Sequence, residues 1–167
     1  KSMAINKLSL YDKYKFDYYG IKNDEIKKHI KHIETNKLDG LNVFQQLVSL
    51  TIKQDNFNEQ LNELPKTLQT LKIKSKSFNQ PLDQLPNISL LKIECDVFNQ
   101  LLNQLPISLK SLTIKSDDFN HPINALPNNL HSLNMNTNEF NQSLNYLPNK
   151  LHYFEITSNH LNQLLDN

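Results

Sequence analysis

Apolar residues recur along most of the chain in a pattern that alternates over three positions. From residue 50 onward, an apolar residue, a variable residue and a second apolar residue follow one another every 20 or 21 residues. Because side chains alternate across a β-strand, each copy predicts a short strand whose middle residue faces away from the core. The six copies are Leu50-Thr-Ile52, Leu71-Lys-Ile73, Leu91-Lys-Ile93, Leu112-Thr-Ile114, Leu133-Asn-Met135 and Phe154-Glu-Ile156.

Two further columns repeat in step with these triplets, which identifies an internal repeat. The first is Phe-Asn, at Phe57-Asn58, Phe78-Asn79, Phe98-Asn99, Phe119-Asn120 and Phe140-Asn141, with Leu161-Asn162 at the next interval. The second is Leu-Pro, at Leu64-Pro65, Leu85-Pro86, Leu105-Pro106, Leu126-Pro127 and Leu147-Pro148. One unit is a residue shorter than the others, and the deletion falls between Pro86 and Leu91.

A strand and a return of this length, always running in the same direction, predict a right-handed parallel β-solenoid of leucine-rich-repeat type. We expect about six coils of 20–21 residues with one short strand each. The returns are too short and turn-rich for full helices, so we expect loops and 3₁₀ turns. A single coil cannot bury its own apolar face. Leu71, Ile73, Phe78, Leu82 and Leu85 should therefore point inward and stack on their equivalents, and the phenylalanines should form an aromatic column.

Each phenylalanine of the repeat is followed by an asparagine, where the strand has ended and the chain turns. Backbone groups there lack a partner in the sheet, and an amide side chain both donates and accepts hydrogen bonds. We therefore predict a structural ladder that bridges adjacent coils; the alternative is a polar ligand site. The ladder residues are Asn58, Asn79, Asn99, Asn120, Asn141 and Asn162.

The repeat resembles the FNIP repeat family, whose units are similar to a short leucine-rich repeat. The residues that carry the resemblance are Phe78-Asn-Gln-Pro81, Phe119-Asn-His-Pro122, the Leu-Pro column and the apolar triplets, and it covers Leu47 to Asn162. The resemblance implies an intracellular binding scaffold of a kind found in amoebae and their giant DNA viruses. In the viral setting such arrays often follow an F-box, which implies a substrate receptor or adaptor for a ubiquitin ligase as the alternative function.

Residues 1–46 differ from the repeats and are predicted to form an N-terminal capping segment ahead of an array over residues 47–167. Ile26, Ile30 and Ile33 follow Asn23-Asp24-Glu25 at helical spacing, which predicts one amphipathic capping helix over about residues 24–35. Leu8-Ser-Leu10 and Tyr14-Lys-Phe16 alternate over short distances. They predict either a hairpin or a degenerate earlier coil.

Composition narrows the classes of function. The formal net charge is +1 and all 18 basic residues are lysine, so the chain lacks the basic footprint of a nucleic-acid or anionic-membrane binder. Two glycines are too few for a Gly-rich phosphate loop, and one cysteine excludes an intramolecular disulfide. The sequence has no stretch of about 18 apolar residues and no signal-like N-terminus. We expect a cytoplasmic protein, in the host cytoplasm if the source is viral.

Few residues suggest catalysis. His131 and His152 are repeat equivalents that should stack, but their column holds no cysteine or acid, so we expect no metal site. The pair Asp117-Asp118 has no predicted cleft, and Cys95 has no histidine in an equivalent position beside it. We therefore expect a protein that is not an enzyme and that uses no cofactor.

The outward residues of the strands vary while the inward ones stay constant, which is the pattern of an adaptable binding face. We expect a non-enzymatic protein–protein interaction scaffold that binds its partner on the exposed face of the parallel sheet. Lysines gather at one end of this face and favour a partner with an acidic segment. The predicted partner-binding residues are Lys53, Lys72, Lys74, Lys92, Thr113, Lys115, Asn134 and Tyr153.

The last strand of the array is predicted to have a partner on one side only. Phe154, Ile156, Leu161, Leu164 and Leu165 would lie at or near this open end. An uncovered strand edge is a template for another chain. We therefore expect a homodimer through the C-terminal end, unless the final ten residues fold back over it.

Overall fold

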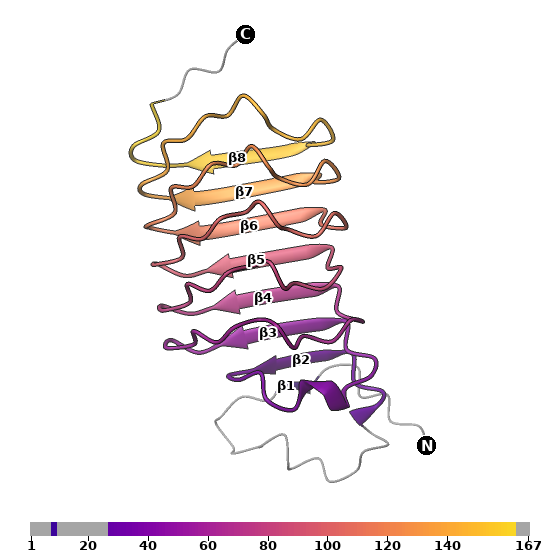
Figure 1. Cartoon of the computed structure of the whole chain (residues 1–167). Helices are drawn as coiled ribbons and strands as arrows, with labels where there is room; N and C mark the ends of the chain where they lie inside the picture. The colour runs from indigo at the N-terminus through magenta and orange to yellow at the C-terminus, as the bar shows by residue number, and fades with distance from the viewer. Residues whose placement is uncertain (1–7, 10–26, 163–167) are drawn as a thin grey trace.

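Residues 8–9 and 27–162 are described by the computed structural model, and they form a parallel β-solenoid (Figure 1). Its strands lie in one sheet in the order of the sequence, and every neighbouring pair is parallel. The strands are β1 (Leu8–Ser9), β2 (His32–Thr35), β3 (Ser49–Lys53), β4 (Thr70–Lys74), β5 (Leu90–Glu94), β6 (Ser111–Ser116), β7 (Ser132–Thr137) and β8 (Tyr153–Thr157).

The six predicted triplets are the strands β3 to β8, one strand in each coil, which confirms this part of the predicted fold. Their register also follows the repeat, since Leu71 pairs with Leu50 and Leu91, and Ile73 pairs with Ile52 and Ile93. Equivalent residues of successive coils thus lie directly side by side. The right-handed sense of the coil and the likeness to leucine-rich repeats stay predictions.

The core is a set of stacked apolar columns inside the coils. Leu71, Ile73, Phe78 and Leu82 are buried, and Leu85 is partly buried against them. The phenylalanines form the predicted aromatic column: successive ring centroids from Phe57 to Phe140 lie 5.7, 5.9, 6.1 and 6.1 Å apart, with the planes within 14° of parallel. Each coil therefore buries its apolar residues mainly against its two neighbours.

The Leu-Pro column forms the corner that leads back into each strand. In the 21-residue coils the proline carbonyl accepts a hydrogen bond from the amide three residues later, as from Leu68 to Pro65 at 3.0 Å and from Leu109 to Pro106 at 2.9 Å. In the short coil the amide of Ile88 reaches Pro86 after only two residues, at 2.6 Å. Ile88 is nevertheless as buried as Leu68 and Leu109. The deletion is absorbed by a tighter turn, so the strand that follows keeps its register.

The predicted capping helix over residues 24–35 is wrong for residues 32–35, which are extended, whereas Lys27 is helical. His32–Thr35 form strand β2, which pairs with β3 in the same register as the repeats, while residues 24–26 lie outside the described part. Ile30 and Ile33 are buried at the positions that Leu47 and Leu50 hold one coil later. The spacing of three residues that suggested a helix is also the spacing between the corner and the strand of each coil.

The coil that contains β2 extends the sheet and core toward the N-terminus. Its return holds the 3₁₀ helix η3 (Leu41–Val43), entered through Gly40 at φ 74°, a conformation that glycine adopts at little cost. Beyond it, β1 pairs with β2 in parallel, which agrees with an earlier coil rather than a hairpin at Leu8. Tyr14-Lys-Phe16 lies outside the described residues. The division predicted at residue 46 stays a prediction.

Strand β8 forms the other end of the described sheet. Phe154 is 38% exposed, although the residue that it pairs with in the preceding coil, Leu133, is buried, and Tyr153 is 50% exposed. Ile156 and Leu161 are partly buried against the core, and Leu164 and Leu165 lie outside the described residues. Self-association through this end therefore stays a prediction.

Candidate binding face

The predicted binding residues lie on the outer face of the sheet, in columns that run across the strands. The middle column is Thr51, Lys72, Lys92, Thr113, Asn134 and Glu155. The column at the strand ends is Lys53, Lys74, Glu94, Lys115, Asn136 and Thr157. Both face away from the core, because they alternate with the buried leucines and isoleucines.

One acid divides the lysines of this face into two groups. Glu94 ends β5 between Lys74 and Lys115, its partners on the neighbouring strands. Its Oε1 lies 2.9 Å from Nζ of Lys92 and 3.5 Å from Nζ of Lys115. The hydrogen bond from Lys92, together with the charges of Lys92, Lys115 and Lys74, lowers the pKa of Glu94, so its carboxylate is ionised at neutral pH. Lys92 and Lys115, which were predicted to bind a partner, are thus already paired within the chain.

The lysines on β4 are arranged differently. Lys72 and Lys74 are exposed, and neither makes an ion pair with any residue that the structure describes. Lys74 lies beside Lys53 in register, and Lys72 lies beside Lys92. Like charges on neighbouring strands repel each other, at a cost in stability of a few tenths of a kcal/mol up to about 1 kcal/mol for each pair. Lys72 and Lys74 therefore carry positive charge on this face that no described ion pair neutralises.

The part of the face on β7 and β8 has no lysine at its outward positions, and hydrogen bonds to Glu155 hold its side chains. On β7 and β8, Nδ2 of Asn134 donates to Oε2 of Glu155 at 2.6 Å, and the hydroxyl of Tyr153 donates to the same oxygen. Thr113 lies between this group and Lys92 in the middle column. The predicted binding residues thus lie on one face, but they form a basic part and a polar part with different chemistry.

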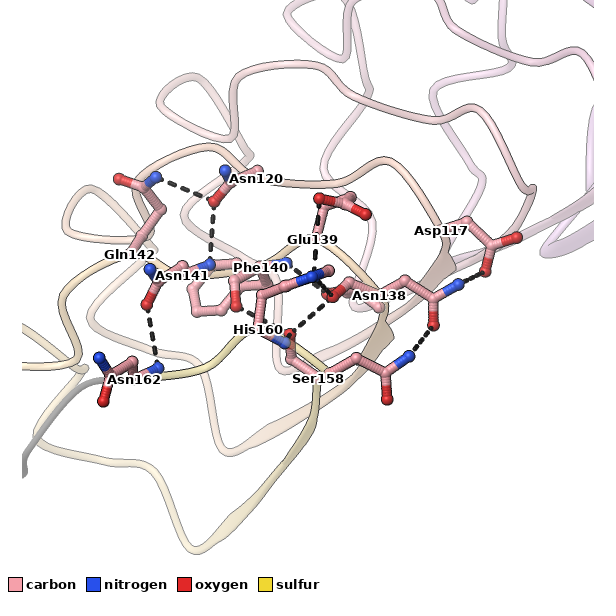
Figure 2. Close-up of polar contacts among 12 residues, drawn as sticks. Asp117, Asn120, Asn138, Glu139, Phe140, Asn141, Gln142, Ser158, His160 and Asn162 are labelled. Carbon is pink, nitrogen blue, oxygen red and sulfur yellow. Dashed lines mark hydrogen bonds and ion pairs between the residues drawn. The ribbon is translucent and has the colours of Figure 1, made fainter.

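The predicted ladder residues lie in one column at the corner that follows the strands. Oδ1 of each asparagine accepts a hydrogen bond from the backbone amide of the next, from Asn58–Asn79 to Asn141–Asn162, at 2.9–3.1 Å. Figure 2 shows the C-terminal part of this ladder, where Asn141 donates to Asn120 and Asn162 donates to Asn141. Glutamines add a second donor in some coils, as Gln142 does to Asn120 at 2.9 Å. The ladder is exposed or half-buried along its length, so water can reach its members.

A second, buried ladder was missed by the sequence analysis. Hydroxyl groups two positions after the triplet reach back to carbonyl oxygens of the preceding coil. Ser116 Oγ lies 3.0 Å from the carbonyl of Asp96 and 2.8 Å from that of Phe98, and Ser75 and Ser158 make the equivalent contacts. The signal was present in the sequence as a column of small polar residues. The column is Ser75, Cys95, Ser116, Thr137 and Ser158.

Cys95 occupies a serine position in this buried ladder. Its Sγ donates to the carbonyl of Phe78 at 3.2 Å, and the residue is 2% exposed. Burial raises the pKa of the thiol, which keeps it protonated and a weak nucleophile at neutral pH. The geometry is that of a structural residue.

Charged residues also gather beside the ends of the strands, in a groove of about 410 Å³ next to Lys74, Glu94 and Lys115. Many of its charged side chains already contact residues of a neighbouring coil. Nζ of Lys76 lies 3.0 Å from Oδ2 of Asp55, and Asp117 Oδ1 accepts from Asn138 at 2.8 Å (Figure 2). Asp117, one acid of the Asp117-Asp118 pair, therefore belongs with Asp55 to a third line of contacts between coils.

Two features of the described residues bear on other classes of function. The rings of His131 and His152 meet edge to face with centroids 5.5 Å apart, but no group of three or more metal-ligating side chains forms in the described part of the chain. No helix among those same residues is long and apolar enough to cross a bilayer.

The comparisons with known proteins agree with the repeat. Residues 98–138, which include β6 and β7, match the family model of the FNIP repeat. This match confirms the resemblance to the FNIP repeat family that the Phe-Asn, Leu-Pro and triplet columns predicted. The comparison with curated proteins gives no match.

Proposed function

We propose that this protein is a non-enzymatic scaffold that binds a protein partner on the outer face of the sheet, and that it does so in the cytoplasm. The observation that carries the proposal is the contrast between the two sides of each strand. Inward positions hold nearly the same residue in every coil, whereas the outward positions from Thr51 to Glu155 change in charge and shape while keeping one register.

The shape of the face supports this function. Neighbouring strands lie about 4.8 Å apart, so the strands β3 to β8 present a surface on which side chains hold fixed relative positions. Their backbones are held by strand pairing and by the ladders between coils, so little order has to be gained on binding. The FNIP repeat model matches residues 98–138 of the array. Proteins built from stacked repeats commonly bind partners on an extended surface.

Affinity purification of the intact chain from its native cell tests the proposal. A triple variant of the face, Thr113→Glu, Asn134→Lys and Tyr153→Ala, should lose the partners recovered with the wild type. A matched variant on the corner, Asn128→Lys, Asn149→Glu and Tyr146→Ala, should retain them. Both sets should melt within about 3 °C of the wild type, because they change exposed or half-buried residues.

Loss of the partners in the corner variant but not in the face variant would refute the proposal. The alternative implied by the resemblance, a substrate receptor or adaptor for a ubiquitin ligase, predicts that ligase components are recovered with the wild type. Ligase components that are recovered equally with the face variant and the corner variant would bind elsewhere on the chain.

A further inference from the structure

We infer that the basic part of the face holds an extended, carboxylate-rich segment of the partner, and that Glu94 is an internal carboxylate that occupies part of the same site. This inference rests on the proposed function and specifies the chemistry of its partner. The open part of the site is Lys72 and Lys74 on β4. The part filled by Glu94 is Lys92 on β5 and Lys115 on β6. Strands β4, β5 and β6 lie side by side in the sheet (Figure 1).

The first observation behind this inference is the repulsion on β4. Lys72 lies beside Lys92, and Lys74 lies between Lys53 and Glu94 in register, yet no described acid is within ion-pair distance of Lys72 or Lys74. Neighbouring cations raise one local potential, which an added carboxylate would lower. Lys72 and Lys74 therefore offer a partner carboxylate two neighbouring ammonium groups that no described ion pair occupies.

The second observation is the position of Glu94. Its carboxylate contacts two lysines from two strands and is itself only 26% exposed. Glu94 thus shows how lysines on neighbouring strands bind a carboxylate: the Nζ atoms of Lys92 on β5 and Lys115 on β6 both approach one oxygen, Oε1. A partner carboxylate can bind Lys72 and Lys74 directly, whereas it has to compete with Glu94 for Lys92 and Lys115. Glu94 therefore sets the border of the open site and weakens binding beyond it.

The geometry favours an extended peptide. Lys72 and Lys74 alternate along one strand, so their Cα atoms lie about 6.6–6.8 Å apart, the distance between alternate residues of an extended segment. Acids at every second position of such a segment match them. Proteins that bind single-stranded nucleic acid combine a positively charged groove with aromatic side chains that stack on the bases and with arginine contacts. The sequence has no arginine, and the outward positions of β3 to β6 hold no aromatic residue.

Fluorescence anisotropy with a labelled octaglutamate peptide at low ionic strength tests the inference. The variant Lys72→Gln/Lys74→Gln should weaken binding by about fivefold or more, because both open cations are lost. The matched variant Lys66→Gln/Lys150→Gln removes the same charge from two exposed corner lysines and should change the affinity by less than about twofold. Glu94→Gln should tighten binding by about threefold or more, because it frees two lysines.

Each of the other outcomes overturns the inference. Equal weakening by the two lysine pairs would show attraction by net charge alone. An unchanged affinity in Glu94→Gln would show that Glu94 does not share the site, and no binding of the peptide would remove the site altogether. Tighter binding of an octathymidylate, or of vesicles that contain phosphatidylserine, with the same dependence on Lys72 and Lys74 would assign the surface to a different ligand.

The experiment also separates this inference from the proposed function. Some cellular partners could be lost in the face variant at Thr113, Asn134 and Tyr153 but bind normally to the variants of Lys72, Lys74 and Glu94. That result would support the scaffold function and refute the binding of an acidic segment. The converse result, peptide binding with the expected pattern but no partner on the face, would refute the scaffold alone.

Discussion

The central coils and the coil that contains β2 reach the same architecture with different sequences. From β3 to β7 each coil has the triplet, the Phe-Asn pair and the Leu-Pro corner, and its ring stacks in the aromatic column. The β2 coil has neither pair. It places Thr35 where its neighbours place Ile52 and Ile73, and it turns through Gly40 and η3.

The features that the two regions share are those that define a coil. Ile30 and Ile33 hold the positions of Leu47 and Leu50, and β2 pairs with β3 over its whole length. A buried residue at the corner, another in the strand and continued strand pairing are therefore enough to add a coil to the solenoid. The phenylalanine column and the asparagine ladder add stability and regularity to coils that already have these features.

The largest expected effect is loss of a ring from the centre of the aromatic column. Phe98→Ala should destabilise the protein by about 3–5 kcal/mol, because Phe98 is fully buried and stacks on Phe78 and Phe119, so its removal opens a cavity shared by three coils. Urea unfolding measures the change. Leu101→Ala, at a residue that is 53% exposed, is the control and should cost less than about 0.5 kcal/mol. Similar costs for the two variants would contradict a continuous column.

The two ladders should differ in their contribution to stability. Ser116→Ala leaves the carbonyl of Phe98 without its hydroxyl donor in a buried site and should cost about 1–3 kcal/mol, whereas the carbonyl of Asp96 keeps the backbone amides of Asp117 and Asp118. Asn99→Ala frees the exposed amide of Asn120, which water can reach, so its cost should be about 0.5–1.5 kcal/mol. Thermal melts rank the variants. Cys95→Ser restores the hydroxyl found at this position in other coils and should leave the stability nearly unchanged. A larger loss of stability in Asn99→Ala than in Ser116→Ala would show that the outer ladder contributes more.

Hydrogen exchange compares the two regions directly. Strand β6 is flanked by long strands on both sides, whereas β2 has the two described residues of β1 on its outer side. Backbone amides of β2 should therefore exchange at least about tenfold faster than those of β6, a difference of about 1.4 kcal/mol in local opening. Exchange at equal rates would mean that the β2 coil opens only with the whole array.

The smallest effect concerns Glu94. Its pKa is lowered from the ordinary 4.5 by Lys92 and Lys115, so its ion pairs stabilise the fold above about pH 4.5, and this contribution disappears as the pH falls through the folded pKa. Because the pairs are half-exposed, the contribution should be at most about 1 kcal/mol. The difference in melting temperature between wild type and Glu94→Gln should therefore shrink between pH 6 and pH 3. A difference in melting temperature that stays constant from pH 6 to pH 3 would contradict this contribution of Glu94.

The sequence was most informative where a residue type recurs in one column. The strands β3 to β8, the inward leucines and the line of asparagines follow from the repeat alone, because stacking forces equivalent residues together. The pairing of Glu94 with Lys92 and Lys115 could not be predicted, since it depends on the rotamers of long side chains. Strand β2 was missed because Ile30 and Ile33 have a spacing common to a helical turn and to a solenoid corner, and no Phe-Asn or Leu-Pro pair marks that coil.

The corner at Pro86 has a consequence for how such an array can be altered. One residue is missing there, yet β5 pairs with β4 and β6 without a shift in register. The number of residues in a return can therefore change at this corner while the side chains of the outer face stay aligned. Protein engineers could therefore graft short loops or labels after the prolines, or splice whole coils between them, as modular parts. Length, attachment points and the recognition pattern of the face would then be independent design variables.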